Sequence, residues 1–464
     1  MSSLFGSMSI ALRSLLAQQG AVGTTTNNIA NANTPGYSRQ RPVLSEEDPV
    51  LVGGLLIGSG VTMSSVESIR DKILELRIQQ ETQQQGSMDA FVTSMGQVEA
   101  LFNETAGVGL QDMLSKFFAD FQALSVNPTN LPLRQAVLTS AENLAGAFRQ
   151  TTSSLATVRS GLDRSVVQTV DEINQLTTQI AGLNGQIQAL EGTGQDAGAL
   201  VDQRNTALDQ LSGLVDVAVI DSGDGGLTVT TTGGTALVAG VTSMSLETQV
   251  DPTSGMHHVY CQGTDITSTL TGGKIKGLLD ARDDAIPSAL SDLDNLAAGL
   301  IDSVNALHQT GYDLNGSPGQ AFFTPFTQLV PGSNAGAAAS ISVALTDPSM
   351  VAASSDGTPG SNGVATALAG LGDQAIVAGQ TAGDFYANLV SRIGNRISDA
   401  STQLEAENLV LRQLQNQRSA ISGVSLDEEA SALIRYQRAF EAAARVISVV
   451  DELTVTTINM VGTG

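Results

Sequence analysis

Both ends of the chain carry one narrow stripe of apolar residues on an otherwise polar segment. Near the N-terminus the stripe keeps a heptad frame and consists of Leu4, Met8, Ala11, Leu15, Val22 and Ile29, with polar Gln18 and Thr25 at the skipped positions. Near the C-terminus the stripe advances in alternating short helical steps and consists of Leu433, Tyr436, Phe440, Ala443, Ile447 and Val450. This spacing is typical of coiled-coil helices. Since a short amphipathic helix is marginal alone, we predict that these residues form an assembly interface, against each other and against neighbouring chains.

Long helices are predicted between the two ends, because apolar residues recur at helical spacing over segments that lack proline. The longest segments are 133–190 and 384–421. Two shorter helices are expected at about 88–104 and 110–125, and Asn127, Pro128 and Pro132 separate them from the first long helix. These patterns indicate a slender helical bundle.

The apolar period changes to two between about 214 and 280, which indicates a small all-β unit inserted between helical segments. Its strand candidates include the alternating Val215, Val217 and Val219, and short segments at 227–231, 237–238, 243–246 and 258–260. Residues 331–365 are rich in Gly, Ala, Ser and Pro and are expected to be irregular, apart from one strand at 341–345. Residues 40–68 are expected to form a hairpin or an extended arm.

The predicted fold is mainly α with an inserted all-β domain, an elongated bundle whose N- and C-terminal helices pair as in a coiled coil. We expect a terminal helical assembly domain (1–45 and 430–464), a long-helix bundle domain (46–213 and 281–429) and an outer β domain (214–280). This nested order predicts both termini at one pole and the β domain farthest from them.

Composition narrows the classes of function. The 464 residues include 22 Lys and Arg against 46 Asp and Glu, a net charge of −24 that repels phosphate and argues against nucleic acid and anionic membranes as partners. Cys261 is the single cysteine, so no intramolecular disulfide can form. Neither a cleavable secretion signal of the usual kind nor a membrane-spanning apolar segment is recognised.

Few side chains are candidates for chemistry. His257, His258 and Cys261 are residue types that bind metals, but neighbouring side chains on a strand point to opposite faces, so we expect an ordinary strand surface there. The acidic run Asp427–Glu429 is expected to favour the dipole of the last helix, with Ser425 and Glu428 as a capping box. We therefore expect no catalytic residues, no metal and no cofactor.

Two motifs at the ends of the chain point to a family. Residues 27–37 read Asn-Asn-Ile-Ala-Asn-Ala-Asn-Thr-Pro-Gly-Tyr, which resembles the N-terminal signature of bacterial flagellar rod, hook and hook-associated proteins. Segments 424–430, 433–439, 444–447 and 457–459 resemble the C-terminal signature of the same superfamily. Segments 272–283 and 305–316, with Phe322–Phe323 soon after, resemble the hook-associated protein 1 family of hook–filament junction proteins. Residues 220–265 match no such pattern.

This resemblance implies a non-enzymatic structural subunit of the bacterial flagellum that self-assembles as a ring at the hook tip. It implies export through the flagellar type III pathway without a cleaved signal, and therefore an extracellular location. The implied partners are further copies of the chain, the hook protein, a second junction protein adjoining the filament, and an export chaperone at the C-terminal helix. Neither nucleic acid nor membrane is implied.

Two alternative functions remain open. One is a hook or distal-rod structural protein of the same superfamily, against which the segments 272–283 and 305–316 argue. The other is a surface adhesin or enzyme with a helical stalk and a β head. The lack of a recognised secretion signal and of a catalytic constellation argues against this second alternative.

Overall fold

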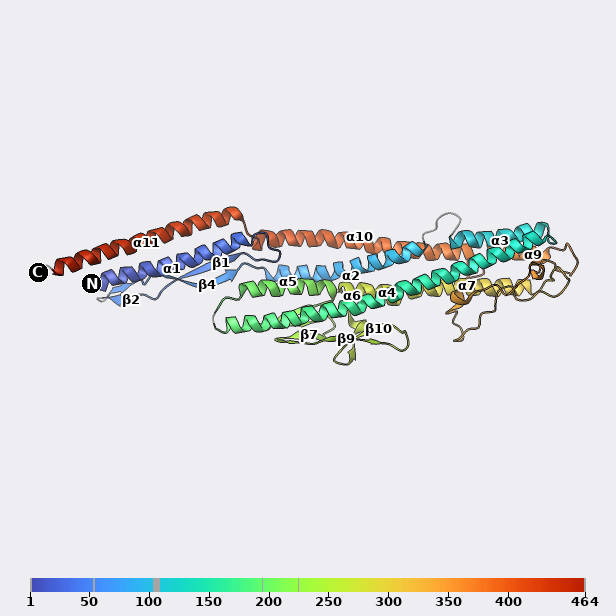
Figure 1. Ribbon diagram of the computed structural model, residues 1–464, viewed down its shortest axis with the longest axis horizontal. Coiled ribbons are helices and arrows are strands. Elements are labelled where there is room, and N and C mark those ends of the chain that lie inside the picture. Colours follow the sequence, from blue (N-terminus) through green and yellow to red (C-terminus); the bar gives the residue numbers. More distant parts are fainter. Residues whose placement is uncertain (1, 53–54, 103–108, 194, 224, 463–464) are drawn as a thin grey trace.

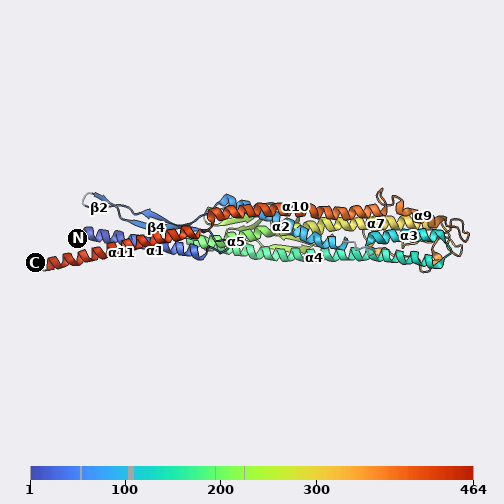
Figure 2. The same ribbon diagram turned by 90° about the horizontal axis from the view of Figure 1, so that it is seen from above.

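The protein is a long, narrow rod that is mainly helical (Figure 1). The computed structural model describes residues 2–52, 55–102, 109–193, 195–223 and 225–462. Both termini lie at one pole of the rod, in the two perpendicular views of Figures 1 and 2. The predicted fold class, an elongated and mainly helical molecule, is confirmed.

The terminal pole is built from two helices and a β arm. Helix α1 (Ser2–Ala30) packs against α11 (Leu426–Gly462), so the predicted pairing of the chain ends is confirmed. The arm consists of β1 (Gln40–Glu46) paired antiparallel with β4 (Val61–Ser68), and of an outer pair, β2 (Val50–Val52) and β3 (Leu55–Ile57). The expected hairpin at 40–68 is therefore present, although its glycines 53 and 54 lie outside the described residues.

The body of the rod is a bundle of long helices. Its main members are α2 (Lys72–Phe102), α3 (Leu110–Val126), α4 (Leu131–Glu191), α5 (Gly198–Leu214), α6 (Gly273–Asp280), α7 (Ile286–His308) and α10 (Ala382–Ser422). The helices expected at 110–125, 133–190 and 384–421 are all present, whereas α2 begins well before the expected residue 88. None of the helices that the structure describes is both long and apolar enough to cross a membrane.

Local sequence signals explain where the longest helix begins. The Asn130 side chain accepts a hydrogen bond from the Leu133 amide at 3.2 Å, which caps α4 at its first turn. Pro132 lies in that turn, where a missing N–H costs nothing because the first amides of a helix have no helical partner. The break predicted from Asn127, Pro128 and Pro132 is thus the loop that reverses the chain between α3 and α4.

Two small antiparallel sheets lie on the flank of the bundle. One has the strand order β5 (Ala218–Asp221), β6 (Leu227–Thr230), β7 (Ala236–Ala239), β8 (Thr242–Ser243). The other has the order β11 (Thr264–Asp265), β10 (His257–Cys261), β9 (Leu246–Val250). Two asparagines of α4 hold these sheets: Asn174 bonds to both backbone groups of Leu246, and Asn184 bonds to the Leu227 and Gly240 carbonyls. The side chains of one helix therefore fix the sheets in place.

The expectation that the β strands lie farthest from the termini is wrong. They lie beside the C-terminal half of α4, and the pole opposite the termini is formed by α3, by α9 (Gly363–Gly370) and by the loops around them (Figure 1). The reason is the length of α4: its 61 residues extend for about 90 Å at 1.5 Å per residue and carry the chain back toward the terminal pole before the strands begin.

The strand expected at 341–345 is also not formed. Val343 makes a single isolated bridge with Phe323, and a short helix, α8 (Ala337–Ser340), precedes it. Ile341 and Leu345 are nevertheless buried. These side chains pack in the core at the pole opposite the termini. A short apolar segment can be buried in this way without pairing as a β-strand.

Candidate assembly interface

The apolar stripe of α11 faces α1. Ala443 and Val450 are buried, and the other predicted members of this stripe, Leu433, Tyr436, Phe440 and Ile447, are half-buried. The positions between them, such as Arg438 and Ser448, are exposed. The heptad frame of the sequence thus identifies which face of α11 packs within the molecule.

The stripe of α1 is rotated from the predicted one. Ala11 is buried, Leu4, Leu15, Val22 and Ile29 are half-buried, and Met8 is exposed. The two polar positions of the frame, Gln18 and Thr25, are buried together with Ala21 and Asn28. Small and polar side chains therefore occupy much of the contact with α11 and with the β arm, and the larger aliphatic residues lie at its margins.

Both helices also present a second apolar stripe that nothing in the described chain covers. On α1 it consists of Phe5, Leu12 and Leu16, and on α11 of Val446, Val449, Leu453 and Met460, all of them exposed. Each set again follows heptad steps, so each occupies one face of its helix. Contiguous exposed apolar faces on a strongly charged protein are typical of surfaces that bind another protein.

A buried polar cluster, which we call the clasp, joins the two terminal helices where they meet the bundle. Asn28 of α1 donates from Nδ2 to the Glu429 carboxylate at 3.0 Å and accepts from the Tyr37 hydroxyl at 2.8 Å. Arg39 donates from Nε to Glu429 at 2.7 Å and also contacts Glu428 at 2.5 Å. Asn28 further bonds to the backbone of Gln40 through both its amide atoms. The clasp is defined by these six residues.

Electrostatics explains why the clasp is stable although it is buried. The Glu429 side chain is 3% exposed, and a carboxylate so deep requires partners that donate to it. Burial raises the pKa of Tyr37 to about 12, and the nearby Asp202 and Glu429 charges act in the same direction, so this phenol remains a donor. Burial alone would lower the pKa of Arg39, but hydrogen bonds and charge from Glu428 and Glu429 raise it.

The clasp gives the terminal motifs a structural role that the sequence did not reveal. Asn28 and Tyr37 belong to the N-terminal motif, and Glu428 and Glu429 belong to the C-terminal one. The two carboxylates were expected to serve the helix dipole and a capping box. They do lie in the first turn of α11, and both also bind Arg39, a residue almost 400 positions earlier in the chain, which no local pattern could indicate.

The three residues considered for a metal site are separated by their partners. His257 bonds through Nδ1 to Asp163 at 2.6 Å, whereas His258 bonds to Asp265 at 2.7 Å. Cys261 is buried and directs its Sγ toward the Ala236 carbonyl. No group of three His, Cys, Asp or Glu residues in the described ranges is arranged to hold a metal.

Asp163 forms a structural ion pair with Arg282. The guanidinium of Arg282, which is fully buried, donates to Asp163 and Asp283, both at 2.7 Å. Burial alone would raise the pKa of Asp163, but the hydrogen bonds from His257 and the charge of Arg282 lower it. Because Arg282 lies in the π-helical turn 281–285 and also donates to the His257 carbonyl, the pair ties β10 to α4 and to the start of α7.

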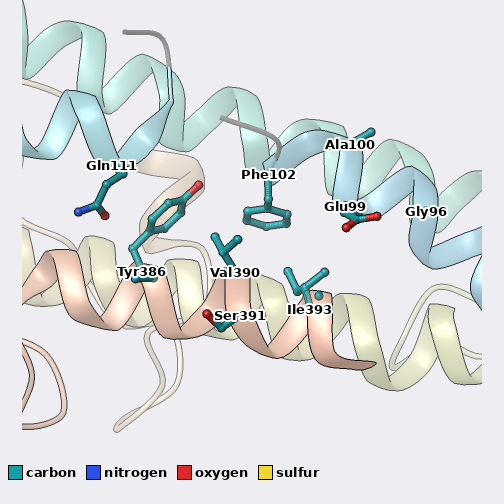
Figure 3. Close-up of a pocket in the computed structure, with 11 residues that line it drawn as sticks. Gly96, Glu99, Ala100, Phe102, Gln111, Tyr386, Val390, Ser391 and Ile393 are labelled. Carbon is teal, nitrogen blue, oxygen red and sulfur yellow. The ribbon is translucent and has the colours of Figure 1, made fainter. Parts of the chain in front are cut away.

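A pocket of about 760 Å³ opens between α2 and α10 (Figure 3). Phe102 and Tyr386 line it, with ring centroids 6.4 Å apart, and Val390 and Ile393 extend its apolar wall. Glu99 supplies the one carboxylate among the described lining residues. The described lining therefore combines an apolar wall with a single acidic side chain.

Comparison with known proteins resolves the identity of the family. Residues 95–323 match the family model described as the flagellar hook-associated protein FlgK helical domain. The chain is 32% identical over 508 residues to flagellar hook-associated protein 1 of Bacillus subtilis, with 100% of both proteins covered. The chain belongs to the flagellar hook-associated protein 1 family. This membership confirms the prediction of a structural, non-enzymatic protein of the flagellum.

Further similarities agree with membership of the hook-associated protein 1 family. Residues 8–37 and 415–460 match the models for flagella basal body rod protein and for the flagellar basal body rod FlgEFG protein C-terminal region. Flagellar hook-associated protein 1 of Escherichia coli is 26% identical, covering 97% of this chain and 98% of its own. The flagellar hook junction protein FlgK from Burkholderia pseudomallei shares the fold, with a TM-score of 0.66 and 18% identity over 75% of this chain and 100% of its own.

Proposed function

We propose that this protein is the subunit that joins hook to filament, by self-assembly at the hook tip. The observation that carries the proposal is the full-length similarity to hook-associated protein 1 together with the exposed second stripes of α1 and α11. A monomer that leaves Phe5, Leu12, Val449 and Leu453 in water gains several kcal/mol by burying them against neighbours. Assembly through the terminal pole would bury these apolar residues against neighbouring subunits.

The same pole is the proposed site of contact with other proteins. In a tube built from such subunits, the terminal pair would form the inner layer and meet the hook protein on one side and a second junction protein on the other. Exposed apolar residues near the end of α11, among them Val455, Ile458 and Met460, would bind an export chaperone before assembly. The opposite pole, formed by α3, α9 and the loops around them, would then lie farthest from this inner layer, and the β sheets would lie between the two.

The alternative of a hook or distal-rod protein is disfavoured by the family models. The two rod models match only the terminal segments 8–37 and 415–460, which many axial proteins share. The hook-associated model matches the helical body, 95–323, including all of α4 and the strands β5–β11. The helical body of the molecule, and not its terminal segments, therefore favours a junction protein over a hook or distal-rod protein.

The test uses a strain that lacks this protein. We expect hooks without filaments, unassembled flagellin in the medium, and full recovery of filaments when the wild-type protein is supplied. Replacing Ala443 with Asp should abolish recovery, because a carboxylate buried between α1 and α11 costs several kcal/mol. Replacing the exposed Ser448 with Asp on the same helix is the matched control and should leave recovery intact.

Secretion and assembly are measured separately in this experiment. Culture supernatant reports export, and immunogold labelling in electron micrographs reports the protein at hook tips. Filaments that form normally without the protein, or a protein that labels the hook shaft instead of its tip, would refute the proposed function.

A further inference from the structure

The tip of the β arm is an exposed apolar surface to which no role has yet been assigned. Val50, Leu51, Leu55, Leu56 and Ile57 are each between 46% and 72% exposed, although they lie within eight positions of one another. The outer strands β2 and β3 pair only with each other in a two-stranded sheet. An isolated two-stranded hairpin with an apolar surface is not stable in water without a partner to cover it.

The arm is fastened to α1 along its middle, which fixes where the tip projects. The Cα of Gly60 lies against Ile10, where an added Cβ would be 3.4 Å from the Ile10 backbone, and an added Cβ at Gly20 would be 2.8 Å from the Met63 sulfur. Arg13 of α1 forms an ion pair with Glu47 at 2.9 Å. The tip then extends toward the pole of the termini, away from α11, with α1 between them (Figures 1 and 2).

The outward face of α11 carries a complementary sequence of groups. Its first half presents Arg435, Arg438 and Arg445, and its second half presents Val449 and Leu453, all exposed. These positions share one face because they are separated by helical steps of three, four or seven residues. Arg438 and Arg445 form no ion pair with any described residue, so both guanidinium groups remain available to a neighbouring molecule.

The arm carries the matching groups in the same order. Glu46 and Asp48 are exposed where the strand pair β1–β4 ends, they make no ion pair in the described chain, and the apolar tip follows them. On both surfaces the charged groups lie nearer the bundle and the apolar groups nearer the terminal pole. From Glu46 to Val52 the arm spans about 20 Å at 3.3 Å per residue, and from Arg438 to Leu453 the helix spans about 22 Å at 1.5 Å per residue.

We propose that the β arm of one copy lies along the outward face of α11 of a second copy. Acidic residues 46 and 48 meet Arg438 and Arg445, and the apolar tip covers Val449 and Leu453. The two molecules point the same way, and each uses a different surface, so the contact is heterologous and closes a ring when the rotation permits. This inference rests on the proposed function, since it assigns the contact through which the ring forms.

The decisive experiment is a cross-link between the two surfaces in assembled flagella. A chain carrying both Leu56→Cys and Leu453→Cys is supplied to the deletion strain and treated with a short thiol-reactive cross-linker. We expect a ladder of covalent dimers and higher species, because every copy joins the next one. Chains with either cysteine alone, and a chain pairing Leu56→Cys with Val126→Cys at the opposite pole, should give no ladder; Cys261 is buried and does not contribute.

A charge exchange tests the charged part of the same contact. Arg438→Glu alone should reduce the number of labelled hook tips roughly tenfold, as reversal of a close interfacial charge does. Adding Glu46→Arg and Asp48→Arg to that chain should restore labelling. A simple folding defect in the first variant would not be rescued by two changes on a different element.

The outcomes separate the inference from the function on which it rests. Wild-type protein at hook tips without a ladder, or a tip cysteine that cross-links to the hook protein, overturns this contact and leaves the junction role standing. A wild-type protein that never reaches the hook tip overturns both.

Discussion

Replacing Glu429 with alanine removes the carboxylate on which the clasp depends. The side chain accepts from Asn28 and from Arg39, and removing it leaves two buried donors with fewer acceptors. Breaking a fully buried ion pair from one side costs about 3–5 kcal/mol. Arg39 is one-quarter exposed and retains Glu428, so we expect about 2–3 kcal/mol here.

The loss should appear as faster opening of the terminal pair and not of the bundle. At about 1.4 kcal/mol per factor of ten, hydrogen exchange of the amides of α1 should accelerate roughly 30- to 150-fold, whereas exchange in α4 should be unchanged. Replacing Glu428 with alanine is the matched control. It binds the same arginine but is 62% exposed, so its removal should change exchange less than about fivefold. Equal effects of the two variants would refute the argument from burial.

Two further predictions concern the bundle. Burial lowers the pKa of His308 to about 4, so between that pH and about 6.5 the unfolded chain binds a proton that the folded chain excludes. About 3 kcal/mol of unfolding free energy should therefore be lost as the pH falls through this window. In urea unfolding, the His308→Gln variant should lack this dependence of the unfolding free energy on pH. Gly277→Ala should destabilise the protein by more than about 2 kcal/mol in urea unfolding, because its Cβ would lie 2.1 Å from the Ser87 carbonyl oxygen. Gly182→Ala, with open space around the added Cβ, should stabilise it by about 0.5–1 kcal/mol. A Gly277→Ala variant of unchanged stability would contradict the close contact between α2 and α6.

The parts of the fold that were predicted correctly are those with long, regular patterns. The stripe of α11 and the segment that became α4 repeat their apolar positions over many turns, so a helical period is unmistakable. Helix α7 was not among the expected helices. It continues from the π-helical turn 281–285, and Pro287 lies where that turn passes into α7.

The parts that were not predicted depend on contacts between distant residues. The motif at 305–316 shows this: the Asn305 side chain accepts from the amides of Phe322 and Phe323, and His308 accepts from the Ala352 amide. The motif is therefore part of the core at the distal pole. The clasp has the same character, and the position of the β sheets depends on how far α4 carries the chain, which a local pattern does not encode.

Because both chain ends lie side by side at one pole, a pull on the two ends and a pull along the rod load the protein differently. Force applied between the termini separates α1 from α11 one turn at a time, until it reaches the clasp. Force along the rod acts on α4 and its neighbours in shear, where many contacts must fail together. A force that pulls on the chain termini, as during unfolding for export, therefore opens the molecule easily. Once neighbouring subunits hold the termini in place, the molecule resists a pulling force along its long axis.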